Sequence, residues 1–352
     1  MTGGIWTKLS SDNEVPRSSQ TLAVLGNNAY IYGGELRPRE PVDSTVYSIQ
    51  LSPSNFFQRP WKRHISNPCT ASLNKEPSAI APSLSPQPRV GAASTALNGK
   101  IYIFSGRGGT AMAPIEEHGS FWEFTPSTQT WAELKVANPK HPYPTGRSYH
   151  ALTNNGSETI YLHAGCPTKG RLGDLWSFNI HTRTWKELLP APAPERGGTS
   201  IAYSQGKIFR MNGFDGNKEQ GGAIDVFDMA TNAWSTISYS PDGVSGPSSR
   251  SVSCLLALSI AGRPSLITMF GERDPSSLGH QGAGKMLADV WVFDIGSEVW
   301  RKVLVEGERP EGRGWFDAGV VADSEGASVV VHGGLAESNE RLGDVWRLDF
   351  AI

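Results

Sequence analysis

The feature that most constrains this chain is one sequence pattern that recurs six times over nearly its whole length. Each copy opens with an arginine followed by a small or polar residue, and an alternating apolar run comes next. A glycine-containing doublet, a variable loop, a second apolar run and a closing tryptophan complete the copy. Because such a unit cannot bury its own apolar face, neighbouring copies must pack against one another. The opening arginines are Arg17, Arg89, Arg147, Arg196, Arg250 and Arg313.

The doublets keep their place in all six copies, and the closing tryptophans keep theirs in the first five. The opening arginines lie 49 to 72 residues apart, around the ~50 residues that kelch repeats require, with insertions in loops. The pattern therefore indicates kelch repeats and predicts an all-β fold, a six-bladed β-propeller in which residues 1–352 form a single domain. The doublets are Gly33-Gly34, Ser105-Gly106, Ala164-Gly165, Asn212-Gly213, Phe270-Gly271 and Gly333-Gly334, and the tryptophans are Trp61, Trp131, Trp185, Trp234 and Trp300.

The last copy ends without a tryptophan, and the missing strand lies at the other end of the chain. The segment IWTKL at 5–9 contains Trp6. We expect this N-terminal strand to join the last blade and close the ring, because closure leaves only short, protected sheet edges. The tryptophans are expected to pack between blades.

Composition excludes several classes of protein. A formal net charge of −2 argues against a nucleic-acid or membrane partner. Three widely spaced cysteines give no disulfide framework and no zinc site. The first ten residues lack the pattern of a secretory signal, and no apolar stretch reaches the ~18 residues of a membrane span. A cytoplasmic location is therefore expected.

Propeller topology places the opening arginines and the residues after each doublet on one face. Function is expected there, because that face carries the longer loops. Glu35, Arg107, Phe214 and Glu272 belong to this set. The Pro/Ser-rich segment 62–88 shows no strand pattern and is expected to be a long inter-blade loop on the same face, either a lid or disordered.

The opening arginines raise two alternatives. Arg147, Arg250 and Arg313, with the other three, could line a central electropositive mouth that binds a sulfate, carboxylate or phosphate, because guanidinium binds such anions bidentately. Alternatively, each arginine pairs with a neighbouring carboxylate or carbonyl and has no ligand role.

The loop of the fifth copy, GERDPSSLGHQGAGKM at 271–286, holds the strongest metal candidates. Glu272 and His280 offer a carboxylate and an imidazole, a pair that Fe(II) sites often use. Asp274 lies close in sequence, and Ser276 is a poor ligand for Fe(II).

The chain resembles the plant nitrile-specifier, thiocyanate-forming and epithiospecifier proteins along its whole length. The segments that carry this resemblance are PRSS (16–19), YGGEL (32–36), RGG (196–198), SRSV (249–252), the GE and LGH of 271–280, RGW (313–315), HGG (332–334) and SNERLGDVW (338–346). The resemblance implies a cytosolic six-bladed propeller that binds non-haem Fe(II). It also implies an activity that steers glucosinolate aglucones, which are thiohydroximate-O-sulfates, to nitriles, thiocyanates or epithionitriles.

The iron motif of that family is Glu-x3-Asp-x3-His. Glu272 and His280 match it, and Ser276 occupies the aspartate position. Asp274 is the remaining carboxylate that could serve if the loop shifts. Arg107 and Trp315 match positions that the family uses around its substrate.

Three functions follow from these residues. The first is a specifier-type enzyme in which Fe(II) binds the substrate sulfur, arginines hold the sulfate and Trp315 packs on the side chain. The second is a metal-free enzyme that cyclises, isomerises or cleaves a biosynthetic intermediate, with Glu35, Asp215, Glu272 or His280 as acid or base. The third is a kelch scaffold that binds a protein partner.

Overall fold

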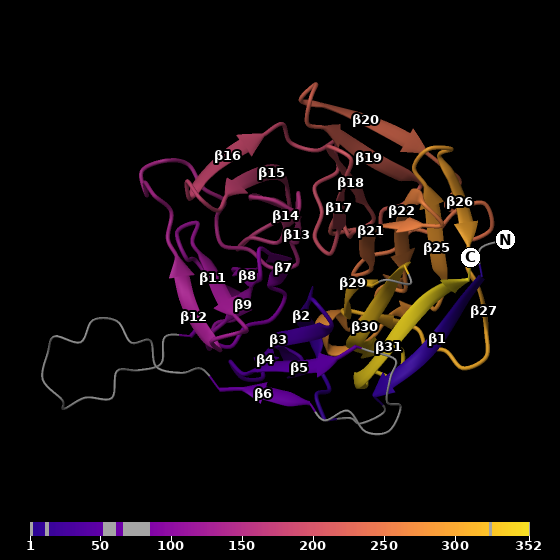
Figure 1. Cartoon of the computed structure of the whole chain (residues 1–352), viewed down its shortest axis with the longest axis horizontal. Helices are drawn as coiled ribbons and strands as arrows, with labels where there is room; N and C mark the ends of the chain where they lie inside the picture. The colour runs from indigo at the N-terminus through magenta and orange to yellow at the C-terminus, as the bar shows by residue number, and fades with distance from the viewer. Residues whose placement is uncertain (1–2, 11–13, 52–60, 66–84, 324–325, 352) are drawn as a thin grey trace, which may run out of the picture.

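The computed structural model describes residues 3–10, 14–51, 61–65, 85–323 and 326–351. The chain forms a closed ring of six β-sheets (Figure 1). In five of these sheets the strands pair antiparallel in chain order from the centre of the ring outwards, and the sixth also contains the N-terminal strand. These sheets are the blades of the predicted all-β propeller, which is confirmed.

The first five blades share one plan, four antiparallel strands each. Blade 1 contains β2 (Ser18–Leu25), β3 (Asn28–Arg37), β5 (Val46–Gln50) and β6 (Lys62–His64), with β4 (Glu40–Pro41) added to β3. Blade 2 contains β7 (Ala93–Leu97), β8 (Lys100–Phe104), β11 (Phe121–Thr125) and β12 (Thr130–Leu134). Blade 3 contains β13 (Ala151–Asn154), β14 (Thr159–Gly165), β15 (Leu172–Asn179) and β16 (Thr184–Leu188).

Blades 4 and 5 repeat this plan. Blade 4 contains β17 (Ser200–Ser204), β18 (Lys207–Met211), β19 (Ala223–Asp228) and β20 (Ala233–Ser238), and blade 5 contains β21 (Cys254–Ile260), β22 (Arg263–Met269), β25 (Val290–Asp294) and β26 (Val299–Lys302). Short ribbons lie in two loops that follow a doublet: β9 (Arg107–Gly108) with β10 (Ala113–Pro114), and β23 (Glu272–Arg273) with β24 (Lys285–Met286). The 3-10 helix η1 (Gly279–Gln281) lies between β23 and β24. No helix in the described part of the chain is long and apolar enough to cross a membrane.

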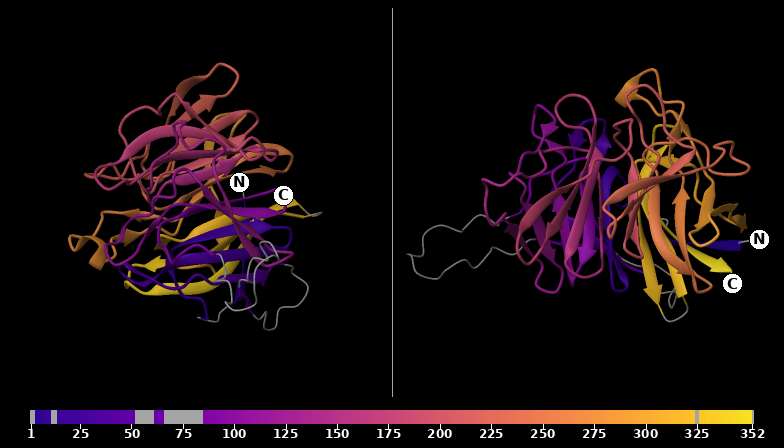
Figure 2. Two further views of the ribbon diagram at one scale, coloured as in Figure 1. Left: turned by 90° about the vertical axis from the view of Figure 1, so that its left-hand side faces the viewer. Right: turned by 90° about the horizontal axis from the view of Figure 1, so that it is seen from above.

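Blade 6 closes the ring with strands from both ends of the chain. It contains β29 (Asp317–Asp323), β30 (Gly326–Ala336), β31 (Arg341–Ala351) and β1 (Gly3–Ser10), with β27 (Leu304–Glu306) and β28 (Arg313–Gly314) at its margins. Strand β1 pairs antiparallel with β31, so that Trp6 lies opposite Leu348. The two termini consequently lie on the same side of the ring (Figure 2). The predicted closure by the N-terminal strand is confirmed.

The closing tryptophans pack between blades, as the sequence predicts. Each of them contacts an aromatic or histidine ring of the preceding blade, with ring centroids 5.3–6.5 Å apart. These contacts pack each blade against the preceding one around the whole ring. The pairs are Trp6–Phe270, Trp61–His332, Trp131–Tyr32, Trp185–Phe104, Trp234–His163 and Trp300–Tyr239.

The six opening arginines form no electropositive mouth, which corrects the first of the two expectations for Arg147, Arg250 and Arg313. All six are buried. Each guanidinium donates to the carbonyl of the first doublet residue of its own blade, at 2.9–3.1 Å. Four of these guanidinium groups also donate two hydrogen bonds to a carboxylate, which balances their positive charge inside the protein. These pairs are Arg89–Glu117, Arg147–Asp174, Arg250–Asp289 and Arg313–Asp344.

The doublets join each blade to the next. The second doublet residue donates its N–H to the carbonyl of the next blade's opening arginine, at 2.8–3.1 Å, and six such bonds run around the ring. The start of the same blade's first strand also approaches this residue closely and leaves no room for a side chain. At Gly165, for example, φ is +106° and an added Cβ would lie 2.9 Å from the Ser148 carbonyl oxygen.

The segment 62–88 begins with a strand, which the sequence analysis did not expect. Lys62–His64 forms β6 and pairs with β5, and the His64 imidazole lies 2.8 Å from the Ser48 hydroxyl. The charged Lys-Arg-His run has no apolar alternation because β6 is the outermost strand of blade 1 and faces solvent on one side. The rest of the expected loop, over 66–84, lies outside the described residues.

Candidate functional site

A cavity of about 410 Å³ opens on the face that carries the longer loops. Two positions of the repeat supply nine of its nineteen lining residues. The first is the residue that follows each doublet, and five of its six members line the cavity: Glu35, Arg107, Cys166, Phe214 and Glu272. The second is the residue two places after each opening arginine, and four of its members line the cavity: Tyr149, Gly198, Val252 and Trp315. The chemistry of the site therefore depends on how these two repeat positions vary between blades.

The second repeat position forms the floor of the cavity. All six of its residues have positive φ, between 47° and 60°. Each donates its backbone N–H to the carbonyl of the equivalent residue in the preceding blade, at 2.7–3.2 Å, so that six hydrogen bonds form a closed circle. This circle holds even Val252 in a backbone region that β-branched residues rarely adopt. The members are Ser19, Gly91, Tyr149, Gly198, Val252 and Trp315.

Three arginines line the cavity, Arg39, Arg107 and Arg171, and the last two bring positive charge from neighbouring blades. Arg107 of blade 2 donates to the Ser148 hydroxyl at 2.8 Å and to the carbonyls of Met112 and Pro167 at 3.1 and 2.9 Å. Arg171 of blade 3 donates to the Phe214 carbonyl at 3.2 Å. Neither arginine has a carboxylate partner among the described residues. Because a guanidinium has five N–H donors, both keep donors for a ligand.

Carboxyl groups from blades 1, 4 and 5 occupy the other parts of the wall. Glu272 is 4% exposed and accepts the Gly284 N–H at 2.7 Å. Burial, with the nearby charge of Glu219, raises the pKa of Glu272 to about 7. Burial also raises the pKa of Glu219 and of Glu35, and the latter lies 3.6 Å from the Arg341 guanidinium. A carboxyl group with a pKa near 7 can give or take a proton at neutral pH.

Three aromatic side chains also line the cavity: Tyr149, Phe214 and Trp315. The Tyr149 hydroxyl lies 3.4 Å from the Ser19 hydroxyl, and an added Cβ at Gly91 would lie 3.0 Å from the Tyr149 ring. The ring therefore lies over blade 2 and reaches blade 1, which narrows the central channel beneath the site.

The expected metal ligands are only partly brought together. Glu272 and Ser276 line the cavity, whereas the Asp274 side chain is 77% exposed, lies 3.6 Å from Arg273 and does not line it. His280 lies on η1, and its side chain is outside the described residues. The side chains that the structure describes form no group of three His, Cys, Asp or Glu that could hold a metal ion.

Among the other predicted site residues, Glu35, Arg107, Phe214 and Trp315 line the cavity, and Arg147, Arg250 and Arg313 do not. Asp215 accepts backbone N–H groups of its own loop and does not line the cavity. Sequence reasoning missed Tyr149, Cys166, Arg171 and Glu219. The first two occupy the repeat positions of Trp315 and Glu272, so the repeat alignment could have identified them.

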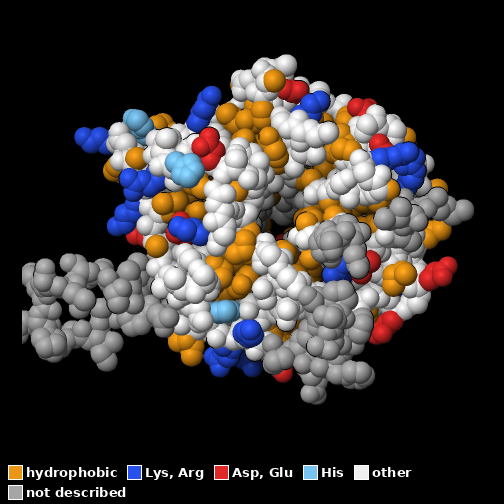
Figure 3. Space-filling model, viewed as in Figure 1, with side chains coloured by type: hydrophobic (Ala, Val, Ile, Leu, Met, Phe, Trp, Pro, Cys, Tyr) orange, Lys and Arg blue, Asp and Glu red, His pale blue; other side chains and the backbone are white. Residues whose placement is uncertain are grey.

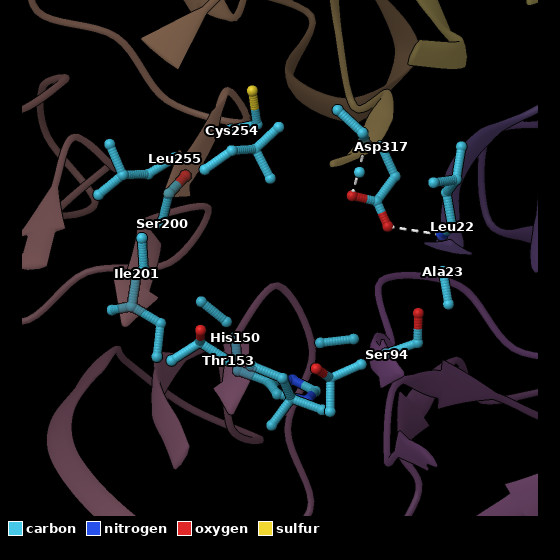
Figure 4. Close-up of a pocket in the computed structure, with 18 of the residues that line it drawn as sticks. Leu22, Ala23, Ser94, His150, Thr153, Ser200, Ile201, Cys254, Leu255 and Asp317 are labelled. Carbon is cyan, nitrogen blue, oxygen red and sulfur yellow. Dashed lines mark hydrogen bonds between the residues drawn. The ribbon is translucent and has the colours of Figure 1, made fainter. Parts of the chain in front are cut away.

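A second cavity of about 470 Å³ occupies the central channel below the floor and shares Tyr149 and Trp315 with the first. The centre of the ring is hollowed, and hydrophobic side chains gather around it (Figure 3). Asp317 is the acidic residue among its lining side chains. Its carboxylate accepts the N–H groups of Leu22 at 2.6 Å and Ala318 at 2.8 Å, so it joins blade 6 to blade 1 (Figure 4). Burial raises the pKa of Asp317 to about 7.

A six-bladed ring with these repeats defines a class of protein, and the chain belongs to the kelch-repeat family. The sequence profile of the KLHDC2/KLHL20/DRC7 Kelch-repeats domain matches residues 19–271. The solved structure of YjhT has the same fold, with a TM-score of 0.67, 18% identity and coverage of 98% of this chain and 100% of that chain.

Among individual proteins, the chain is similar to the N-(sulfonatooxy)prop-2-enimidothioate sulfolyase of Thlaspi arvense. The two are 25% identical over 373 residues, which cover 97% of this chain and 96% of that protein. This match confirms the predicted resemblance along the whole chain. Kelch domain-containing protein 10 of Homo sapiens is 25% identical over 223 residues, which cover 60% of this chain and 45% of that protein. The chain thus matches slightly less than half the length of that relative.

Proposed function

We propose that this protein is a lyase of the specifier kind that acts on a small organic anion, such as a sulfate ester, in the cavity on the face that carries the longer loops. One observation carries the proposal: the cavity combines two arginines without carboxylate partners among the described residues and a buried carboxyl group whose pKa is about 7. Similarity to a sulfolyase over 97% of the chain supports the same kind of reaction. The name of that relative describes a substrate that carries a sulfonatooxy group, which is anionic.

Each wall of the cavity has a part in such a reaction. In a sulfolyase reaction the bond between the sulfate oxygen and the rest of the substrate breaks, and the leaving sulfate takes the electron pair. Arg107 and Arg171 would bind the sulfate and offset the negative charge that it gains. Tyr149, Phe214 and Trp315 would pack against the organic part. Glu272 would take or give the proton that the organic product requires.

The Fe(II) that the resemblance implies does not fit the side chains that the structure describes. Fe(II) would need further ligands beside Glu272, and Ser276 offers only a hydroxyl where the resembling family has an aspartate. When bound, the metal would act as a Lewis acid toward the substrate. No step above depends on it. Anaerobic Fe(II) titration of the parent and of Ser276→Asp tests this fit, and we expect tighter binding by Ser276→Asp. Equal, tight binding of Fe(II) by both proteins would contradict the statement that the described side chains do not fit the metal.

The proposed function is tested with N-(sulfonatooxy)prop-2-enimidothioate as substrate. The organic products are analysed without protein, with the parent, with Glu272→Gln and with Glu308→Gln, which changes an exposed glutamate. We expect the parent and Glu308→Gln to change the product mixture and Glu272→Gln to lose this effect without a change in melting temperature. If the parent leaves the products unchanged, this substrate is wrong. If the parent also binds no organic sulfate, the proposal fails, and a scaffold for a protein partner becomes the better account.

A further inference from the structure

Two carboxyl groups of the candidate site lack the arginine partner that several other carboxylates of the blades have. Five buried or half-buried carboxylates each hold an arginine at 2.6–2.8 Å: Glu117, Asp174, Asp225, Asp289 and Asp344. Glu219 and Glu272 have no arginine or lysine partner within the described parts of the chain. Both of these side chains line the cavity.

Ser251 brings the two carboxyl groups to the same wall. The backbone of Ser251 exchanges two hydrogen bonds with that of Glu272, each of 2.9 Å. The Ser251 hydroxyl donates to the Glu219 carboxylate at 3.3 Å. Two carboxylates held this way repel each other in a partly dehydrated cavity, and either a proton or an external cation must relieve the repulsion.

The positive groups of the cavity come from different blades. Arg39 belongs to blade 1, Arg107 to blade 2 and Arg171 to blade 3, whereas Glu219 and Glu272 belong to blades 4 and 5. Blades 2 and 5 lie on opposite sides of a six-membered ring, so Arg107 and Glu272 approach the cavity from opposite sides, whereas Arg171 and Glu219 come from adjacent blades. A ligand with only negative charge would bind the arginines and leave the two glutamates without a partner.

We propose that the ligand of this cavity is amphoteric, with an anionic group held by Arg107 and Arg171 and an ammonium-type N–H donor held by Glu219 and Glu272. The inference rests on the proposed function for its anionic end and adds the cationic end. The aromatic side chains of Trp315 and Tyr149 line the same cavity and suit an apolar spacer between the two charged groups. An ammonium ion beside these rings would also gain cation–π attraction.

Three matched probes test the inference by calorimetry on the full chain. Tyramine O-sulfate carries both charges, 4-ethylphenyl sulfate carries only the sulfate, and 2-phenylethylamine carries only the ammonium. We expect tyramine O-sulfate to bind the parent at least about tenfold more tightly than 4-ethylphenyl sulfate at pH 8, because only tyramine O-sulfate offers an ammonium group to Glu219 and Glu272.

Variants separate this inference from the proposed function. Glu219→Gln and Glu272→Gln should reduce the preference for tyramine O-sulfate and leave 4-ethylphenyl sulfate binding within about twofold, whereas Glu308→Gln should change neither. Equal affinity of the parent for the two sulfates overturns the amphoteric ligand and leaves the anion site intact. Binding of 2-phenylethylamine alone overturns the anion site of the proposed function. Failure of all three probes to bind overturns both.

Discussion

Replacement of Trp6 by alanine should be among the most destabilising single changes in the protein, although the residue lies near the chain terminus. Trp6 is 7% exposed, stacks on Phe270 at 5.9 Å and meets Trp346 edge-on at 6.5 Å. Loss of such a side chain costs about 4 kcal/mol, from the transfer of its surface and the cavity left behind. An unfolding entropy of about 2.1 cal/mol/K per residue, applied to 352 residues, converts that cost into a melting temperature about 5 °C lower.

The assay is urea unfolding followed by intrinsic fluorescence and circular dichroism, with the midpoint and the slope fitted separately. Ile5→Ala is the matched control, because Ile5 neighbours Trp6 on β1 but is 60% exposed. We expect Ile5→Ala to cost less than about 1 kcal/mol. If Trp6→Ala costs no more than Ile5→Ala, then β1 does not close the ring and the account of blade 6 is wrong.

Three further changes test the charged groups. Arg250→Ala should lower the free energy of unfolding by about 3–5 kcal/mol, because it leaves the Asp289 carboxylate without its cation. In the same urea titration, Arg107→Ala should cost less than half of that. Equal costs would show that both arginines are structural. Asp317→Asn should become more stable than the parent as the pH rises from 4 to 7, by up to about 4 kcal/mol. The reason is that the pKa of Asp317, raised to about 7, disfavours the ionised carboxylate in the folded state. A stability difference that is constant with pH would contradict this. The activity of the parent should change around pH 7, where Glu272 titrates. The pH–activity profile of Glu272→Gln should lack this change. If the change remains in the variant, another group is responsible for it.

The fold could be predicted from the sequence because its signals are repeated. An opening arginine, a doublet and a closing tryptophan recur in register, and the missing sixth tryptophan points to Trp6. The outermost strand of blade 1 was missed because Lys62–His64 carries no apolar alternation. An outer strand that faces solvent needs little of it.

The candidate site was predictable only in part. The position after each doublet led to Glu35, Arg107, Phe214 and Glu272, which the structure brings into one cavity. The role of Arg147 and its equivalents was open, because a sequence does not show how many partners a guanidinium has inside the protein. A signal was present, however: Asp174 lies two residues before Trp176, and its carboxylate accepts the Trp176 indole N–H as well as the Arg147 guanidinium.

Glu219 and Arg171 could not be found from the repeat, because they lie in variable loops outside its recurring positions. Their place in the wall depends on the path of the loops that follow the doublets. The side chains of those loops are positioned by local hydrogen bonds, such as that from Ser251 to Glu219. Periodicity and composition carry no information on such contacts.

The most direct test of the central claim is calorimetric binding of 4-ethylphenyl sulfate. The proteins compared are the parent, the double variant Arg107→Gln/Arg171→Gln and the control Arg301→Gln, which removes an exposed charge on the outermost strand of blade 5. The account predicts that the parent and Arg301→Gln bind alike and that the double variant binds at least about tenfold more weakly, because it loses charge-assisted hydrogen bonds. Equal affinity of the double variant, or no binding by the parent, would contradict an anion site in this cavity.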